Sequence, residues 1–207
     1  MEIMTGAGPA RADVEAPARP GLLVVLTHGA GGGVGTKDIF AAQRSALAAG
    51  AAVALVTQPY RVRGARAPGS PDRQDAAWLE IIGALRGDYP GLPLVQGGRS
   101  NGARVACRTA QAAAAAAVVA LAFPLHPPGQ AGQPERSRAA ELRAAGVPVL
   151  VISGDRDPFG VPDPADADRL VVLQGETHAL SRHPEAISAA VASWLRDVAQ
   201  RAGLPAR

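Results

Sequence analysis

Short runs of apolar residues alternate along the chain with longer segments in which apolar positions recur at helical spacing. Apolar runs of this length, bounded by turn residues, are typical of parallel strands that are buried on both faces. The runs are Leu22–Leu26, Ala52–Val56, Leu92–Val95, Val118–Ala122, Val147–Ile152 and Leu170–Leu173. This alternation predicts an α/β fold, a three-layer sandwich in which a mostly parallel sheet of about six strands carries helices on both faces.

The segments between the runs carry the signals of helix ends. Ser70 is a good capping residue, Pro71 suits the first helical position, and Gly146 is typical of the position just after a helix. Helices are expected over residues 36–50, from 71 onward, over 134–146 and from 184 onward. The alanines at 112–117 predict that the helix following Ser100 continues through them, because alanine is the strongest helix former.

A length of 207 residues suits one domain. We expect a single domain over residues 21–200, with a flexible N-terminal tail at 1–20 and a C-terminal tail at 201–207. Only residues 123–133 separate the fourth apolar run from the next helix, which is too short for a cap domain. Neither a secretory signal nor a run able to span a bilayer is evident, so we expect a cytoplasmic protein without membrane insertion.

Composition and charge exclude several classes of protein. Hydrophobic residues make up 47% and charged residues 19%, as in a globular rather than a disordered chain. The net charge of +3 comes from scattered arginines, and Lys37 is the only lysine. Because aromatic residues reach only 3%, a nucleic-acid surface with stacking rings is not expected. The lone Cys107 cannot form an internal disulfide and should pack inside a helix.

Residues 98–102 read Gly-Arg-Ser-Asn-Gly between a predicted strand and a predicted helix. This pattern is typical of a nucleophile elbow, in which a serine on a sharp turn needs small residues two positions before and two after it. Gly98 and Gly102 satisfy that need. The turn exposes the Ser100 hydroxyl and directs the positive end of the next helix toward it, so we predict that Ser100 is a nucleophile rather than part of an ordinary glycine-rich turn.

Residues 28–33 read His-Gly-Ala-Gly-Gly-Gly directly after the first predicted strand. In folds with such an elbow, this loop supplies one of the two backbone N–H groups that bind an oxyanion, here that of Ala30, and Asn101 supplies the other. A phosphate-binding loop is the alternative. Val34 stands where the dinucleotide motif needs glycine, and Gly-Thr-Lys at 35–37 is not the Gly-Lys-Ser/Thr of a P-loop, so no nucleotide is expected.

The loop after the fifth apolar run holds two candidate acids, Asp155 and Asp157. A carboxylate at this edge of the sheet can hold the correct tautomer of a catalytic imidazole. We favour Asp157, which lies three residues after Gly154 and precedes a proline that stiffens the turn, and we assign Asp155 to a cap or salt bridge. His178 follows the next strand and completes the order serine, acid, histidine.

Other polar residues receive structural interpretations. His28 should shape the glycine loop, and His183 should begin the last helix. Asp163, Asp166 and Asp168 lack the glycine and glutamate spacing of a calcium loop and are expected to be solvated. Neither a metal nor an organic cofactor is expected.

Arg61, Arg63 and Arg66 crowd the loop after the second apolar run, which leaves the sheet at the same edge as Ser100. Together with Gly31 of the glycine loop they are candidate substrate-binding residues, and their charge could favour an anionic ester. A solvated loop is the alternative, since exposed charge needs no function.

Five segments and His178 resemble the testis-expressed-protein-30-like family of small α/β-hydrolases, which is distantly akin to the dienelactone hydrolases. The segments are 28–32, 59–61, 98–102, 123–129 and 154–160. The resemblance spans nearly the whole domain and implies serine-hydrolase roles for Ser100, Asp157 and His178, without a metal or organic cofactor. Asn101 stands where the family commonly has methionine, which keeps the N–H group and makes the pocket floor more polar.

Residues and resemblance together predict a carboxylesterase-like serine hydrolase with a small-molecule, ester-like substrate: a carboxylester, a thioester or a lactone. The resembled family also includes a subunit of a chromatin-modifying complex, so the alternative is a non-catalytic interaction or scaffold protein. The three triad residue types and both glycine loops count against this alternative, because a scaffold has no physical need of them together.

Overall fold

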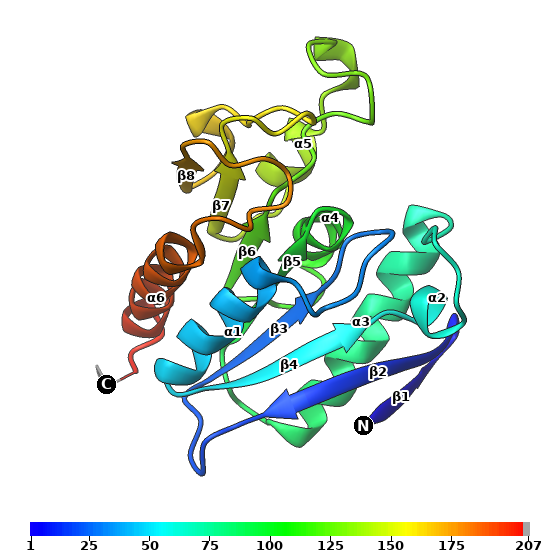
Figure 1. The fold of residues 1–207 in the computed structure, drawn as a ribbon. Coiled ribbons are helices and arrows are strands. Elements are labelled where there is room, and N and C mark those ends of the chain that lie inside the picture. Colours follow the sequence, from blue (N-terminus) through cyan, green and yellow to red (C-terminus); the bar gives the residue numbers. More distant parts are fainter. Residues whose placement is uncertain (205–207) are drawn as a thin grey trace.

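A computed structural model describes residues 1–204 as three layers, a central sheet with helices on each side (Figure 1). The sheet has eight strands in the order β1-β2-β4-β3-β5-β6-β7-β8. The strands are β1 (Glu2–Thr5), β2 (Gly8–Glu15), β3 (Leu22–Thr27), β4 (Ala51–Thr57), β5 (Leu94–Arg99), β6 (Ala117–Leu121), β7 (Val149–Gly154) and β8 (Arg169–Leu173). Strands β3 to β8 pair in parallel, whereas β1 and β2 are antiparallel.

The helices divide between the two faces of the sheet. They are α1 (Lys37–Ala48), α2 (Pro59–Val62), α3 (Pro71–Asp88), α4 (Asn101–Thr109), α5 (Ala139–Arg143) and α6 (Pro184–Arg201), with short 3-10 turns η1 (Pro134–Arg136) and η2 (Pro164–Asp166). Helices α1 and α6 pack against each other and share a core that contains Trp194. Helices α3 and α4 pack on the opposite face, around a core that contains Trp78. The predicted three-layer α/β sandwich is confirmed.

All six predicted apolar runs fall on strands β3 to β8. The largest shift is at β5, which begins at Leu94 and continues to Arg99, beyond the predicted end at Val95. Gly97 and Gly98 allow the strand to continue between its neighbours β3 and β6. A Cβ atom at Gly97 would lie 2.3 Å from the Val119 carbonyl oxygen, so only glycine lets the backbones come this close.

The expected N-terminal tail is wrong, because residues 2–15 form β1 and β2 and raise the strand count from six to eight. Strand β2 pairs with β4, and its Ala10 and Ala12 are completely buried. Alternation of these small residues with Arg11 and Asp13 is the period of a strand with one buried face. The signal is weak in the sequence because alanine contributes little hydrophobicity.

The expected continuation of the helix through residues 112–117 is also wrong. Helix α4 ends at Thr109, the Ala115 N–H group bonds to the Ala110 carbonyl at 3.0 Å, and Ala114 has a left-handed φ of 46°. Strand β6 must begin at Ala117 to pair with β5, and this tertiary demand outweighs helix propensity. Similarly, the helix expected over 134–146 is divided into η1 and α5.

The chain ends behave differently from the two expected tails. Helix α6 runs to Arg201, so the expected tail at 201–207 begins within a helix, and residues 205–207 lie outside the described residues.

Cys107 is fully buried in α4, where burial raises the pKa of its thiol. Within residues 1–204, no helix combines the length and the apolar character needed to cross a membrane.

Candidate active site

Ser100 lies on the sharp turn between β5 and α4. Its backbone has φ 55° and ψ −115°, a conformation that non-glycine residues rarely adopt. The Ser100 N–H group donates to the Leu121 carbonyl at 2.9 Å, which fastens the turn to the end of β6. The strained turn predicted from the sequence is therefore present.

The two glycines that flank the turn are required by close backbone approach. A Cβ atom at Gly98 would lie 2.5 Å from the Thr27 carbonyl oxygen, and one at Gly102 would lie 2.8 Å from the carbonyl oxygens of Thr27 and His28. Both contacts are with backbone atoms at the end of β3, which cannot move aside as a flexible side chain could. The spacing of glycines around Ser100 thus has a steric cause.

The structure brings together the three residues that the sequence singled out. His178 Nε2 lies 2.9 Å from Ser100 Oγ, and His178 Nδ1 lies 2.7 Å from Asp157 Oδ2. The Asp157 side chain is completely buried, and its second oxygen accepts from the Phe159 N–H group at 2.9 Å. Asp155 is exposed, and its backbone N–H group donates to Leu173. Only Asp157, of the two candidate acids, contacts the imidazole.

Phe159 is a site residue for which sequence reasoning gave no role. Its ring packs on the His178 ring, with centroids 4.4 Å apart and planes tilted by 56°. Because its N–H group also holds Asp157, this one residue restrains both partners of the imidazole–carboxylate pair. The available signal was an aromatic residue two positions after the favoured aspartate.

Arg99 is a second residue that sequence reasoning passed over. Its Nε atom lies 3.0 Å from a carboxylate oxygen of Asp38, and another nitrogen donates to the His178 carbonyl at 2.8 Å. Asp38 lies in the first turn of α1, and its side chain is completely buried. The signal in the sequence was a charged residue placed between a glycine and the nucleophilic serine of the elbow.

Glu176 organises the loop that carries His178. It is 1% exposed, and its carboxylate accepts from the backbone N–H groups of Ser181, Arg182 and His183, just before α6. His183 occupies the position before the first residue of α6, as expected. A Cβ atom at Gly154 would lie 2.3 Å from the Glu176 carbonyl oxygen, so glycine at the end of β7 lets this loop approach.

His28 fixes the glycine loop after β3 by hydrogen bonds. The Gln58 N–H group donates to His28 Nε2 at 3.0 Å, so Nδ1 carries the proton and donates to the Gly29 carbonyl at 2.8 Å. Burial lowers the pKa of His28, in agreement with a neutral ring. The Tyr60 hydroxyl donates to the Ala30 carbonyl at 3.1 Å, and burial raises the pKa of Tyr60 to about 12. The expected role of His28 in shaping this loop agrees with these contacts.

The two backbone N–H groups predicted to bind an oxyanion have no acceptor among residues 1–204, since neither Ala30 nor Asn101 donates a backbone hydrogen bond there. Gly29 brings the loop against the elbow, because a Cβ atom on it would lie 3.2 Å from Ser100 Cβ. Asn101 begins α4, whose N-terminus carries partial positive charge. Within residues 1–204, the Ala30 and Asn101 N–H groups are therefore unpaired donors in the two segments that meet at Ser100.

The three arginines of the loop after β4 differ in their contacts. Arg61 donates to the Gly32 carbonyl at 2.9 Å and to the Ala65 carbonyl at 3.0 Å, so it holds the glycine loop. Arg63 donates to the Ala7 carbonyl, and Arg66 is exposed.

All three aspartates expected in a solvated loop have defined structural partners. Asp163 and Asp166 form a capping box around η2, and Asp166 is buried. The Val149 N–H group donates to Asp168 at 2.8 Å, at the start of β7. Across residues 1–204, no three His, Cys, Asp or Glu side chains are grouped as a metal site would require.

A mostly parallel eight-stranded sheet with helices on both faces, and with the elbow after β5, defines the α/β-hydrolase fold. Residues 20–186 match the family model described as the alpha/beta hydrolase domain. The chain belongs to this family.

Solved structures with the same fold span nearly the whole chain. Est1E from Butyrivibrio proteoclasticus, solved with ferulic acid, is 18% identical, covers 97% of this chain and 99% of its own, and has a TM-score of 0.77. XC6422 from Xanthomonas campestris, described as an a/b serine hydrolase without lid, is 20% identical over 100% of this chain and 95% of its own, with a TM-score of 0.69. An esterase from Pyrobaculum calidifontis is 20% identical over 94% and 82%, with a TM-score of 0.67. No curated protein matches the sequence significantly.

Proposed function

We propose that this protein is a carboxylesterase-like serine hydrolase that cleaves an ester-like bond through Ser100, His178 and Asp157. The observation that carries the proposal is the continuous hydrogen-bond chain from Ser100 Oγ to His178 at 2.9 Å and from His178 to Asp157 at 2.7 Å. These separations lie within the range over which a base can take the proton of a nucleophile and be oriented by a carboxylate.

In the proposed reaction, Ser100 Oγ attacks the substrate carbonyl carbon while its proton passes to His178 Nε2. The carbonyl oxygen gains negative charge and accepts from the Ala30 and Asn101 N–H groups. His178 then returns the proton to the leaving-group oxygen or sulfur, the bond to that atom breaks, and an acyl-enzyme remains. Water attacks this ester with His178 again as base, which releases the acid and restores Ser100.

Several features support an ester-like substrate. The structural relatives include a protein named as an esterase and one solved with ferulic acid, a carboxylic acid. Only residues 122–138 separate β6 from α5, so no cap domain is inserted there within residues 1–204, which suits a small or exposed carboxylester, thioester or lactone. The motifs at 28–32, 98–102 and 154–160 further support membership of the testis-expressed-protein-30-like branch.

Substrate binding is assigned to the loops around Ser100. Gly31 is exposed and has no neighbour within 4 Å of an added Cβ atom, so open space adjoins the glycine loop at this position. Arg61 would act by holding this loop, through its bond to Gly32, rather than by touching substrate. Arg63 and Arg66 are exposed and would contribute positive charge at this edge.

A fluorophosphonate probe tests the assignment, because it reacts with an activated serine whatever the acyl substrate is. We expect the probe to label the purified protein and mass spectrometry to locate the adduct on Ser100. Ser100→Ala should abolish labelling and lower hydrolysis of p-nitrophenyl acetate by about a millionfold. Ser70→Ala is the matched control, since Ser70 is exposed and donates no side-chain bond within residues 1–204.

The scaffold alternative makes the opposite forecast for the same experiment. A folded protein that reacts neither with the probe nor with activated esters would contradict the hydrolase proposal and leave the non-catalytic interaction protein as the better explanation. Circular dichroism and a cooperative unfolding transition establish that such a protein is folded.

A further inference from the structure

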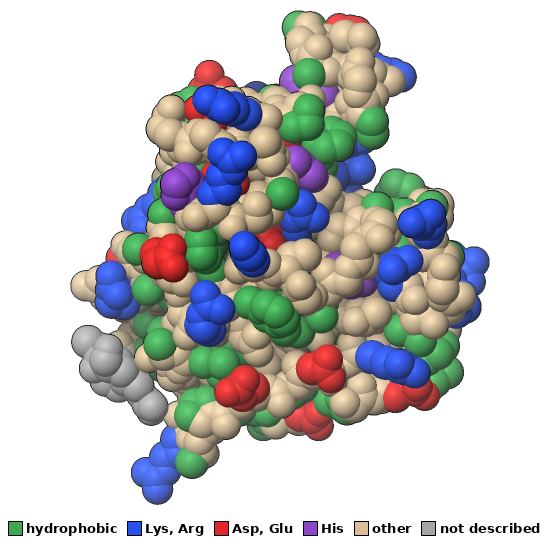
Figure 2. Space-filling view, viewed as in Figure 1, with side chains coloured by type: hydrophobic (Ala, Val, Ile, Leu, Met, Phe, Trp, Pro, Cys, Tyr) green, Lys and Arg blue, Asp and Glu red, His purple; other side chains and the backbone are tan. Residues whose placement is uncertain are grey.

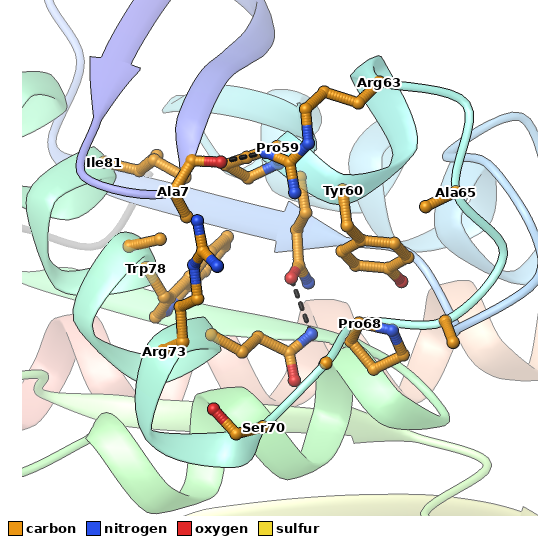
Figure 3. A pocket seen from close by; sticks show the side chains of 15 residues that line it. Ala7, Pro59, Tyr60, Arg63, Ala65, Pro68, Ser70, Arg73, Trp78 and Ile81 are labelled. Atoms are coloured by element: carbon orange, nitrogen blue, oxygen red, sulfur yellow. Dashed lines mark hydrogen bonds between the residues drawn. The ribbon is translucent and has the colours of Figure 1, made fainter.

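A second pocket lies apart from the Ser100 site, on the α3 side of the sheet (Figure 3). It has a volume of about 230 Å³ and is enclosed by the β1–β2 turn, α2, the segment 63–70 and α3. None of the five residues assigned above to the triad and oxyanion hole lines it. The pocket exists because residues 2–15 form an edge hairpin, whose turn places Ala7 on the wall.

The floor of the pocket combines apolar surface with an amide pair. Trp78 and Ile81 of α3 lie beneath the floor and are at most 1% exposed, so the accessible apolar surface comes from Ala7, Ala67 and Pro68. Gln58 and Gln74 are both buried, and the Gln74 amide nitrogen donates to the Gln58 side-chain oxygen at 2.7 Å. No residue in the described part of the chain donates to the Gln74 side-chain oxygen, so this acceptor is left for a hydrogen-bond donor from a ligand.

The charged residues of the pocket are all of one sign. Arg63 and Arg73 line it, and no acidic residue among 1–204 does. Both side chains extend toward the Ala7 side of the pocket in Figure 3, and basic side chains are also visible over this region in Figure 2. Arg63 uses one nitrogen on the Ala7 carbonyl, whereas Arg73 is exposed and donates to no acceptor within residues 1–204. Guanidinium groups so placed suit a carboxylate.

We propose that this pocket binds a small aromatic carboxylate that also carries a hydroxyl group. The carboxylate lies against Arg63 and Arg73, the ring packs on Ala67 and Pro68, and the hydroxyl donates to the Gln74 side-chain oxygen. A volume of about 230 Å³ is smaller than a drug-sized site and restricts the ligand to roughly one ring.

The pocket shares its inner wall with the loop that carries Ala30. Gln58 donates its N–H group to His28, and the Tyr60 hydroxyl donates to the Ala30 carbonyl. Both residues also line the pocket. The ligand could therefore originate as a product of the hydrolytic site or as an independent metabolite, and the chemistry required of it is the same in both cases.

Direct binding tests the proposal without reference to turnover. 4-Hydroxybenzoate is titrated into the Ser100→Ala protein by calorimetry, alongside 4-hydroxybenzamide, benzoate and inorganic phosphate. We expect 4-hydroxybenzoate to bind with a Kd of about 1 mM or tighter. The amide should bind about tenfold more weakly because it lacks the charge, and benzoate should bind more weakly because it lacks the hydroxyl.

Variants locate the bound molecule. Arg73→Gln should weaken 4-hydroxybenzoate binding by about tenfold, because it removes a charge-assisted contact without disturbing a protein–protein bond. Arg44→Gln makes the same change of net charge at an exposed position of α1 outside the pocket, and should leave Kd unchanged. The titration is repeated with wild-type protein whose Ser100 is blocked by the fluorophosphonate probe, and retained binding of 4-hydroxybenzoate identifies a site independent of Ser100. The acid that the protein releases from a hydrolysed ester is then added as a competitor. Displacement of 4-hydroxybenzoate by this acid identifies the product as the ligand.

Three results would overturn the proposal. The first is no binding of 4-hydroxybenzoate at millimolar concentration by a folded protein. The second is equal weakening by Arg73→Gln and Arg44→Gln, which would indicate a general charge effect. The third is inorganic phosphate binding as tightly as the aromatic acid, which would show that the apolar surface contributes nothing. None of these depends on whether Ser100 is a nucleophile, so failure here and failure of the hydrolase proposal remain distinguishable.

Discussion

The guanidinium group of Arg99 lies 3.0 Å from the carboxylate of Asp38, although the two residues are far apart in the sequence. Asp38 is completely buried in the first turn of α1, while the Arg99 side chain is 19% exposed. Burial raises the pKa of Asp38 above its ordinary value, and Arg99 acts in the opposite direction. Because Arg99 also donates to the His178 carbonyl, one side chain joins the turn of Ser100, the loop of His178 and helix α1.

Removal of Arg99 should therefore destabilise the whole fold. Arg99→Met leaves the Asp38 carboxylate buried without its partner, and we expect the free energy of unfolding to fall by about 3 kcal/mol. Adding Asp38→Asn to Arg99→Met should recover part of this loss, since the buried charge is then gone. Urea denaturation of the wild type, both single variants and the double variant measures the coupling. Strictly additive effects would show that the two side chains do not stabilise each other.

The identity of the acid can be tested by paired substitutions. Asp157→Asn should lower kcat for an activated ester by about 10⁴-fold, because an amide beside His178 Nδ1 favours the wrong tautomer of the imidazole. Asp155→Asn should leave kcat near the wild-type value, since Asp155 is exposed and does not contact the ring. Equal losses in the two variants would contradict the assignment of Asp157.

Glycine at position 98 should be indispensable, unlike glycine within helix α3. A Cβ atom added by Gly98→Ala would lie 2.5 Å from the Thr27 carbonyl oxygen, and we expect a loss of about 2 kcal/mol or more in unfolding free energy. Gly83→Ala adds a Cβ atom that meets nothing within 4 Å and should stabilise the protein by up to about 1 kcal/mol. Thermal unfolding of both variants decides the matter, and a Tm for Gly98→Ala at or above wild type would refute the steric explanation.

His28 should make stability depend on acid pH. Burial lowers its pKa in the folded protein below 6.5, so below pH 6.5 the unfolded chain binds a proton that the folded protein does not. Stability from this group is complete above pH 6.5 and falls as pH drops toward the folded pKa, by at most about 1.4 kcal/mol per pH unit. His28→Gln removes the titrating group and should flatten the curve of unfolding free energy between neutral pH and pH 5. Parallel curves for the two proteins would show that His28 is not responsible.

Features that depend on a few neighbouring residues could be predicted from the sequence. The apolar runs of β3 to β8 were evident because strands buried on both faces must be apolar throughout. The elbow at 98–102 was evident because its steric demands act within five residues. The prediction of a helix through the alanines at 112–117 was wrong because it considered only local preference. Their helix propensity is a local preference, and the pairing of β6 with β5 is stronger than it.

By itself, the sequence determined the succession of the six parallel strands β3 to β8, the strained serine turn and the set of residues available for its chemistry. Only the tertiary structure decided that Asp157 rather than Asp155 meets His178, that Arg99 pairs with Asp38, and that the first fifteen residues complete the sheet and a second pocket. The physical reason is how far apart in the sequence the interacting residues are. Backbone clashes and apolar periodicity act between neighbours in the chain, whereas an ion pair, a hydrogen bond or a pocket depends on distances between residues that only the packed sheet brings together.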